Sequence, residues 1–224
     1  MPNTRIHLLS TGELSPTLIR EATAKGVVID AISFIQTEPV AQPGLEELLG
    51  RPLVAVFTSK NAVRALGDKG GEWWKIYCIG DMAGQRFGED AIAGTAPSAT
   101  GLAEEIMRTH EGREIYFFCG DKRRDELPAL LKKVGFTVHE ITVYRTIATP
   151  HSLTGKFDAI AFFSPSSVDS YFSSNEPEAG IPMFAIGETT AEAIRGRCAN
   201  PVIVGPRPDK EQLIRLMIEY FEHE

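Results

Sequence analysis

Three short segments of this chain recur in its second half, in the same order, and this repeat constrains the fold more than any other feature. The pairs are Gly26–Phe34 with Gly135–Val143, Val56–Val63 with Ala161–Val168, and Tyr77–Asp81 with Phe184–Glu188, each 105 to 109 residues apart. In the second pair, an apolar run ends in serine and leads into a segment that can start a helix. Two copies are too few for a solenoid. The repeat therefore predicts two similar α/β halves.

Predicted strands and helices alternate along the whole chain, which indicates parallel, doubly wound sheets. Two long β-rich stretches, Val27 to about Thr37 and Phe136–Ile147, are closed by Pro39 and Pro150. If both stretches cross between the halves, the chain forms two lobes joined by a two-strand linker. Lobe 1 is then discontinuous, residues 1–36 and 147–224, and lobe 2 is the inserted segment 38–144.

The turns that follow the predicted strands are the expected ligand sites, because open α/β sheets bind ligands beyond the carboxyl ends of their strands. These turns contain Ser59, Gly80, Gly120, Ser164 and Gly187, and we expect them to face one cleft between the lobes. Helix starts at such turns present free N–H groups that suit anions. The alternative is that Ser59 and Ser164 only cap their own helices.

Composition narrows the class of function. The chain has 224 residues, 43% of them hydrophobic and 24% charged, as in ordinary globular proteins. A net charge of −7 argues against nucleic acid or an anionic membrane surface as partner. No apolar run approaches the roughly 18 residues of a membrane span, and no signal peptide is evident, so we expect a cytoplasmic protein.

Cofactor and metal motifs are missing from the sequence. The three cysteines have no metal-ligand spacing, the histidines no paired spacing, and neither a dinucleotide fingerprint nor a phosphate loop follows a strand. A cofactor-free, metal-free enzyme and a pure binding protein both remain.

Three further groups have both a functional and a structural interpretation. Lys122-Arg123-Arg124 is either a solvated helix start or a binding site for carboxylates or phosphates, since cations are unfavourable at a helix N-terminus. Tyr144, on the second long stretch, either packs or reaches the cleft. Thr189 and Thr190 either cap a helix or donate hydroxyls to a ligand.

Six segments in series carry a resemblance to a known family: Phe57–Val63, Tyr77–Gly80, Phe118–Asp121 with Leu127-Pro128 and Leu131, Ile141–Thr146, Phe162–Ser166 and Ala185–Ala191. Together they resemble the uroporphyrinogen-III synthase family, over nearly the whole chain. The resemblance implies two α/β lobes joined by a two-strand ladder, a linear tetrapyrrole bound between them, and no cofactor. It also implies a monomer, with transient contact with the preceding pathway enzyme.

The family reaction closes hydroxymethylbilane into uroporphyrinogen III with inversion of the last pyrrole ring. Because unassisted closure proceeds without inversion, the resemblance implies catalysis mainly by orientation. Tyr144 matches the family's candidate acid for hydroxide departure. The candidate contacts for the eight substrate carboxylates are Ser59, Lys60, Gly120, Ser164, Ser166, Thr189 and Thr190.

Two positions depart from the family pattern. Many members have an arginine where this chain has Ser10-Thr11-Gly12, and some have a hydroxyl residue where Ala83 stands. The rival interpretation, from another class, is a non-enzymatic two-lobed binding protein for an anionic metabolite.

Overall fold

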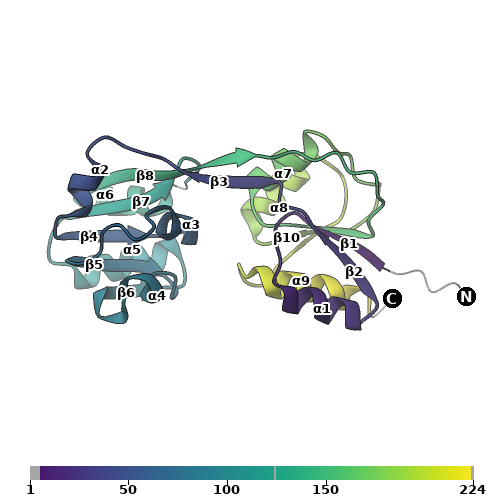
Figure 1. Cartoon of the computed structure of the whole chain (residues 1–224), viewed down its shortest axis with the longest axis horizontal. Helices are drawn as coiled ribbons and strands as arrows, with labels where there is room; N and C mark the ends of the chain where they lie inside the picture. The colour runs from purple at the N-terminus through teal and green to yellow at the C-terminus, as the bar shows by residue number, and fades with distance from the viewer. Residues whose placement is uncertain (1–5, 124, 223–224) are drawn as a thin grey trace, which may run out of the picture. The chain divides into compact units, whose positions relative to one another are not determined.

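The computed structural model describes residues 6–123 and 125–222. The chain forms two compact units, coloured by residue number in Figure 1. Unit 1 comprises Met1–Gln36 and Ile147–Glu224, and unit 2 is the continuous segment Thr37–Thr146.

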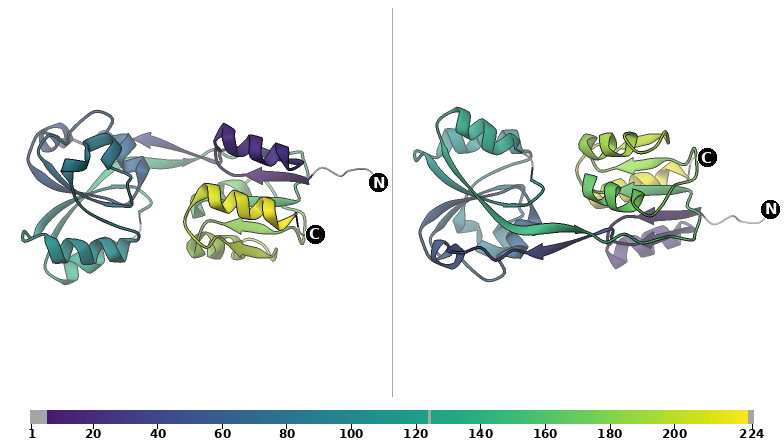
Figure 2. Two further views of the ribbon diagram at one scale, coloured as in Figure 1. Left: turned by 90° about the horizontal axis from the view of Figure 1, so that it is seen from below. Right: turned by 90° about the horizontal axis from the view of Figure 1, so that it is seen from above.

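Unit 1 is built on a five-stranded sheet in the order β11-β10-β9-β1-β2, with every neighbouring pair parallel. Its strands are β1 (Ile6–Ser10), β2 (Val27–Ala31), β9 (Ala159–Phe162), β10 (Met183–Ala185) and β11 (Val202–Val204). Helices α1 (Pro16–Ala24) and α9 (Lys210–Tyr220) cover one face, and α7 (Pro165–Phe172) and α8 (Glu188–Arg195) the other (Figures 1 and 2). Leu8 packs with the first pair and Leu9 with the second, because successive strand residues point to opposite faces.

Unit 2 has a six-stranded sheet in the order β3-β8-β7-β4-β5-β6. Its strands are β3 (Ile35–Pro39), β4 (Leu53–Phe57), β5 (Trp74–Ile79), β6 (Ile92–Ala96), β7 (Glu114–Gly120) and β8 (Thr137–Ala148). The core on one face is formed with α2 (Leu45–Leu49), α3 (Lys60–Ala65) and α4 (Gly84–Phe87). Helices α5 (Ala99–Thr109) and α6 (Glu126–Lys133) complete the core on the other, and a 3-10 turn, Glu89–Ala91, precedes β6.

The predicted repeat appears as one strand order used twice. Without β3, the unit 2 order β6-β5-β4-β7-β8 matches the unit 1 order β11-β10-β9-β1-β2 position by position. The repeated segments fall on β4 and β9, β5 and β10, and β8 and β2, so each pair occupies equivalent places. The strand order reverses between β4 and β7 and between β1 and β9. These are the switch points where ligands of such sheets bind.

The first long β-rich stretch differs from the single strand expected over 27–37. It is two strands, β2 and β3, separated by a turn that buries Phe34 completely in the core of unit 1. The Ile32 and Phe34 amides donate to the carbonyls of Ser10 and Thr11, and the Ser33 hydroxyl donates to the Ile35 carbonyl at 2.7 Å. Local hydrogen bonds and burial of one ring therefore outweigh the β-propensity of the segment.

The second stretch, β8, is continuous for 12 residues and runs antiparallel to β3. The Thr149 amide donates to the Phe34 carbonyl and the Val40 amide to the Val143 carbonyl. From the first bond to the second, the residue number rises from 34 to 40 in one segment and falls from 149 to 143 in the other, as in an antiparallel pair.

Candidate active site

The candidate site of unit 2 begins where β4 gives way to α3. Ser59 has an extended backbone and caps α3, its hydroxyl accepting a hydrogen bond from the Asn61 amide at 3.1 Å. The capping interpretation of Ser59 is therefore correct. The same hydroxyl also takes part in a second interaction, which gives this turn its chemical interest.

That second partner is Tyr144 of β8, whose hydroxyl lies 3.1 Å from the Ser59 Oγ. Gly120, the last residue of β7, pairs with Tyr144 across an irregularity in the register. A Cβ on Gly120 would lie 2.4 Å from Cζ of the Tyr144 ring. The ring therefore occupies the space that any side chain at position 120 would need. The structure thus brings together Ser59 and Gly120, at the ends of β4 and β7, and Tyr144, inside the long strand β8.

The backbone of Tyr144 is also held. Its carbonyl accepts a hydrogen bond from the Asp121 amide at 3.1 Å, and the Asp121 carboxylate accepts one from the Thr146 amide at 2.9 Å. These bonds tie the turn after β7 to β8 at Tyr144 and two residues beyond it. The tyrosine is consequently a fixed group on a rigid element.

Burial raises the pKa of the Tyr144 phenol above its usual value of 10, and the nearby Cys119 and Asp121 act in the same direction. The hydrogen bond from Ser59 opposes them, because it stabilises the phenolate. The phenol therefore keeps its proton at neutral pH. A neutral, half-buried phenol with a fixed orientation can donate that proton to a leaving group.

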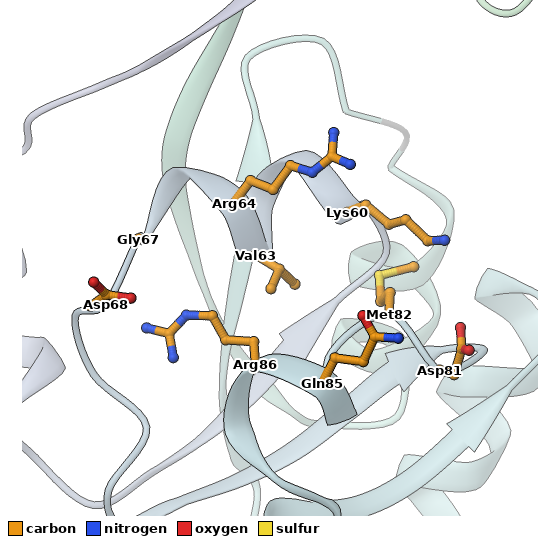
Figure 3. A pocket seen from close by; sticks show the side chains of 9 residues that line it. All are labelled: Lys60, Val63, Arg64, Gly67, Asp68, Asp81, Met82, Gln85 and Arg86. Atoms are coloured by element: carbon orange, nitrogen blue, oxygen red, sulfur yellow. The ribbon is translucent and has the colours of Figure 1, made fainter. Parts of the chain in front are cut away.

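Lys60 begins α3 and lines a pocket of about 410 Å³ in unit 2. Figure 3 shows the side chains around it. The lining residues are Lys60, Val63, Arg64, Gly67, Asp68, Asp81, Met82, Gln85 and Arg86. Lys60 thus belongs to a cationic pocket directly beside the Ser59 turn.

The other predicted contacts lie in unit 1. Ser164 caps α7 in a capping box, in which its hydroxyl accepts from the Ser167 amide and the Ser167 hydroxyl accepts from the Ser164 amide. Ser166 follows in the first turn and is partly exposed. At the start of α8, Thr189 is exposed whereas Thr190 is only 2% exposed. Their role as carboxylate contacts stays a prediction.

In the basic segment after β7, Arg123 is paired with carboxylates and is not a free cation. Arg123 forms ion pairs with Asp125 and Glu140, and Lys132 of α6 also pairs with Glu140. Arg124 lies outside the described residues. The charge of Arg123 is therefore compensated by carboxylates, which favours the structural interpretation of this residue.

The segment Ser10–Gly12, where many family members have an arginine, is held by its own hydroxyls. Ser10 donates to the Gly12 carbonyl at 2.6 Å and Thr11 to the Ala161 carbonyl at 2.8 Å. The cation near this turn is Lys210, from the start of α9, whose Nζ lies 4.8 Å from the centre of the Phe163 ring. Lys210 Nζ also donates to the Glu13 carbonyl.

Sequence reasoning missed Lys210, Arg64 and Arg86. The position of Lys210 depends on long-range packing of α9 beside β9, which no local motif indicates. For Arg64 a signal existed, since Lys60 and Arg64 are four residues apart on a predicted helix and so share one face. For Arg86 no such signal existed, because α4 is a single turn, Gly84–Phe87.

Within residues 6–123 and 125–222, no three metal-binding side chains come together in a group able to hold an ion. In the same part of the chain, no helix is both long and apolar enough to cross a membrane.

Comparison with known proteins gives a family match over most of the chain. The family model described as uroporphyrinogen-III synthase HemD matches residues 16–215. A uroporphyrinogen-III synthase of Chlorobaculum parvum is 24% identical over 204 residues, covering 79% of this chain and 82% of the relative.

Two solved structures show the same fold. Uroporphyrinogen-III synthetase from Helicobacter pylori has a TM-score of 0.67 at 15% identity, covering 96% of this chain and 99% of its own. A mutant uroporphyrinogen III synthase from Thermus thermophilus has a TM-score of 0.64 at 18% identity, covering 98% and 100%. The two-lobed α/β fold and the match over residues 16–215 lead to one conclusion: the chain belongs to the uroporphyrinogen-III synthase family.

Proposed function

We propose that this protein is a uroporphyrinogen-III synthase, which closes hydroxymethylbilane into uroporphyrinogen III in tetrapyrrole biosynthesis. The observation that carries the proposal is the family match over residues 16–215. The hydrogen-bonded pair of Ser59 and Tyr144, 3.1 Å apart, supports it with a group suited to the first chemical step. As an enzyme, it would be a lyase that releases water.

In the proposed reaction, the Tyr144 phenol donates its proton to the terminal hydroxyl of the linear tetrapyrrole. The C–O bond breaks and water leaves, so a protonated azafulvene, a cation, remains. The substituted carbon of the last pyrrole ring then attacks this cation and forms a spiro intermediate. The bond from that carbon to its original methylene bridge breaks, and the bridge carbon rejoins the ring at its other α-carbon, so that the ring ends inverted. Loss of a proton completes the macrocycle and balances the proton taken from Tyr144. Ser59 supports this step, because its hydroxyl fixes the direction of the phenol and stabilises the phenolate.

Control of the product isomer requires orientation of the substrate more than a strong acid. The substrate carries eight carboxylates, and charge-assisted hydrogen bonds to such groups are short and directional. We propose that Lys60 of unit 2 and Ser164, Ser166, Thr189 and Thr190 of unit 1 contact these carboxylates through side chains or helix-start amides. Gly120 acts differently, by leaving room for the Tyr144 ring.

We also propose that the protein works as a monomer in the cytoplasm and receives its unstable substrate during transient contact with the preceding pathway enzyme. The mechanism above uses only side chains and backbone groups of this chain.

The test of the enzymatic role is turnover of hydroxymethylbilane, generated in place by the preceding enzyme. Tyr144→Phe should lower kcat by about 10²-fold or more, as expected for loss of a general acid, with little change in KM. Tyr116→Phe is the matched control, because the Tyr116 hydroxyl donates to the Glu114 carboxylate at the start of β7, at 3.2 Å. Folded wild type without turnover would refute the function and favour a binding protein. Equal turnover of Tyr144→Phe and wild type would remove the acid role alone.

A further inference from the structure

The pocket between α3 and α4 of unit 2 has a charge pattern that the proposed reaction does not yet use. Lys60 and Arg64 enter it from α3, and Arg86 enters from α4 (Figure 3). Asp68 and Asp81 also line it. Three cations and two carboxylates leave the lining with a net positive charge, in a chain whose overall charge is −7.

Among the residues that the structure describes, the three cations form no close ion pair with the carboxylates nearby, although the charge of Asp68 acts on Arg86. Within the described part of the chain, Lys60, Arg64 and Arg86 form no ion pair within 4 Å, although fifteen such pairs involve other side chains. Lys60 and Arg64 are four residues apart on α3, so their like charges repel on one helix face. An anion between them would relieve this repulsion.

Arg86 adds a directional feature. One Nη donates to the Lys69 carbonyl at 2.7 Å, and the guanidinium lies 4.1 Å from the centre of the Phe87 ring. Its Nε is buried and has no hydrogen-bond partner among the described residues. A buried donor without a partner is costly, and arginine binds carboxylates through two parallel N–H groups. Because this Nε is closed off, Arg86 can offer an incoming carboxylate its charge and its terminal N–H groups.

We propose that this pocket is a carboxylate subsite, in which Arg64 and Arg86 join Lys60 to bind acidic side chains of the linear tetrapyrrole. The inference rests on the proposed function and goes beyond it by assigning two residues that the resemblance does not. The volume of about 410 Å³ lies within the range of roughly 300–1,000 Å³ common for small-molecule sites. It suits part of a large substrate, such as the acid groups of one pyrrole ring.

The position of the pocket favours substrate carboxylates over an unrelated anion. Lys60 directly follows Ser59, whose hydroxyl contacts Tyr144. An acid group held at Lys60 is therefore one residue from the turn that orients the proposed acid. Because the subsite binds a part of the substrate that does not react, it should lower KM more than it raises kcat.

The experiment compares wild type with Arg64→Gln, Arg86→Gln and the double variant, all as full-length protein. Arg20→Gln is the matched control, since Arg20 is an exposed arginine of α1 that donates to the Thr17 hydroxyl. For each protein, KM, kcat and the type III to type I product ratio are measured with hydroxymethylbilane. Binding of uroporphyrin III, the stable oxidised product, is measured by fluorescence titration, and Tm reports folding.

The double variant should raise KM by about tenfold or more and weaken uroporphyrin III binding by a similar factor, because each charge-assisted hydrogen bond lost is worth about that much. Its kcat should stay within about twofold of wild type. Arg86→Lys, which keeps the charge but not the terminal N–H groups of the guanidinium, should fall between wild type and Arg86→Gln. If Arg86→Gln lowers Tm strongly, the exposed Arg64→Gln and the Arg86→Lys variant still decide the result.

Two outcomes overturn the proposal, and they are distinguishable. Wild-type KM and affinity in a folded double variant would refute the subsite, while type III product from wild type would leave the proposed function intact. A wild-type protein that does not convert hydroxymethylbilane would refute the proposed function and this inference together.

Discussion

Replacing Gly120 with alanine would place a methyl group inside the space of the Tyr144 ring. The added Cβ would lie 2.4 Å from Cζ, 2.6 Å from Cε2 and 2.8 Å from the hydroxyl oxygen of Tyr144. Ordinary contacts begin near 3.4 Å, so the ring must move by about 1 Å. The Ser59–Tyr144 hydrogen bond is already 3.1 Å long and would not survive that shift. Gly120 has no positive φ, so the backbone itself accepts alanine.

A misplacement of about 1 Å costs roughly 10²-fold in rate when the group must be aligned with its substrate. We therefore expect Gly120→Ala to lower kcat by about 10²-fold, with overpacking reducing the free energy of unfolding by about 1–3 kcal/mol. The assay is hydroxymethylbilane turnover with denaturant unfolding as a second readout. Gly155→Ala is the control, because its Cβ would meet only the Phe157 ring at 3.7 Å.

A double-mutant cycle isolates the cause of this loss. In a Tyr144→Phe background the acid is already absent, so adding Gly120→Ala should cost little further activity. Full additivity of the two losses, or wild-type turnover of folded Gly120→Ala, would refute the argument that Gly120 acts by positioning the phenol.

Three further predictions follow from single groups. Because burial raises the pKa of Tyr144 above 10, the acid stays protonated as pH rises. The kcat of wild type should therefore fall only above about pH 10, and an earlier fall absent in Tyr144→Phe would contradict this. Ser164→Ala removes the cap of α7 and should lower the free energy of unfolding by about 1 kcal/mol in denaturant titrations; no change would contradict the cap's role. Burial raises the pKa of the Cys119 thiol to about 11 and also raises the pKa of the Cys78 thiol. Because both are buried and Cys198 is less so, a thiol reagent near neutral pH should label Cys198 first. Rapid labelling of Cys119 in folded protein would show that assignment to be wrong.

The presence of two similar α/β units could be predicted from the sequence because it follows from a repeat. Each repeated segment carries a buried strand, and parallel α/β units have few allowed connections. One strand was missed, β6, whose sequence Ile-Ala-Gly-Thr-Ala has little β-propensity. Gly94 within it lies against the Tyr77 ring, where a Cβ would be 2.9 Å away. Packing across the sheet, rather than local preference, makes this segment a strand.

The candidate site likewise combines residues that the sequence could indicate with contacts that only packing determines. Ser59, Gly120 and Tyr144 were predictable as residues at strand ends or on a long strand, since parallel strands end at a common edge. The compensation of Arg123 by Glu140 was not, because it depends on an ion pair between the turn after β7 and strand β8. The buried Nε of Arg86 was equally hidden, since only packing determines which of its donors finds a partner.

The product isomer ratio tests the central claim most directly. Hydroxymethylbilane is generated in place by the preceding enzyme, with and without this protein, and the products are oxidised and separated as type I and type III porphyrins. The account predicts predominantly type III product that depends on this protein, because orientation of the last ring is what the enzyme contributes. Type I alone, from protein shown to be folded, would contradict it.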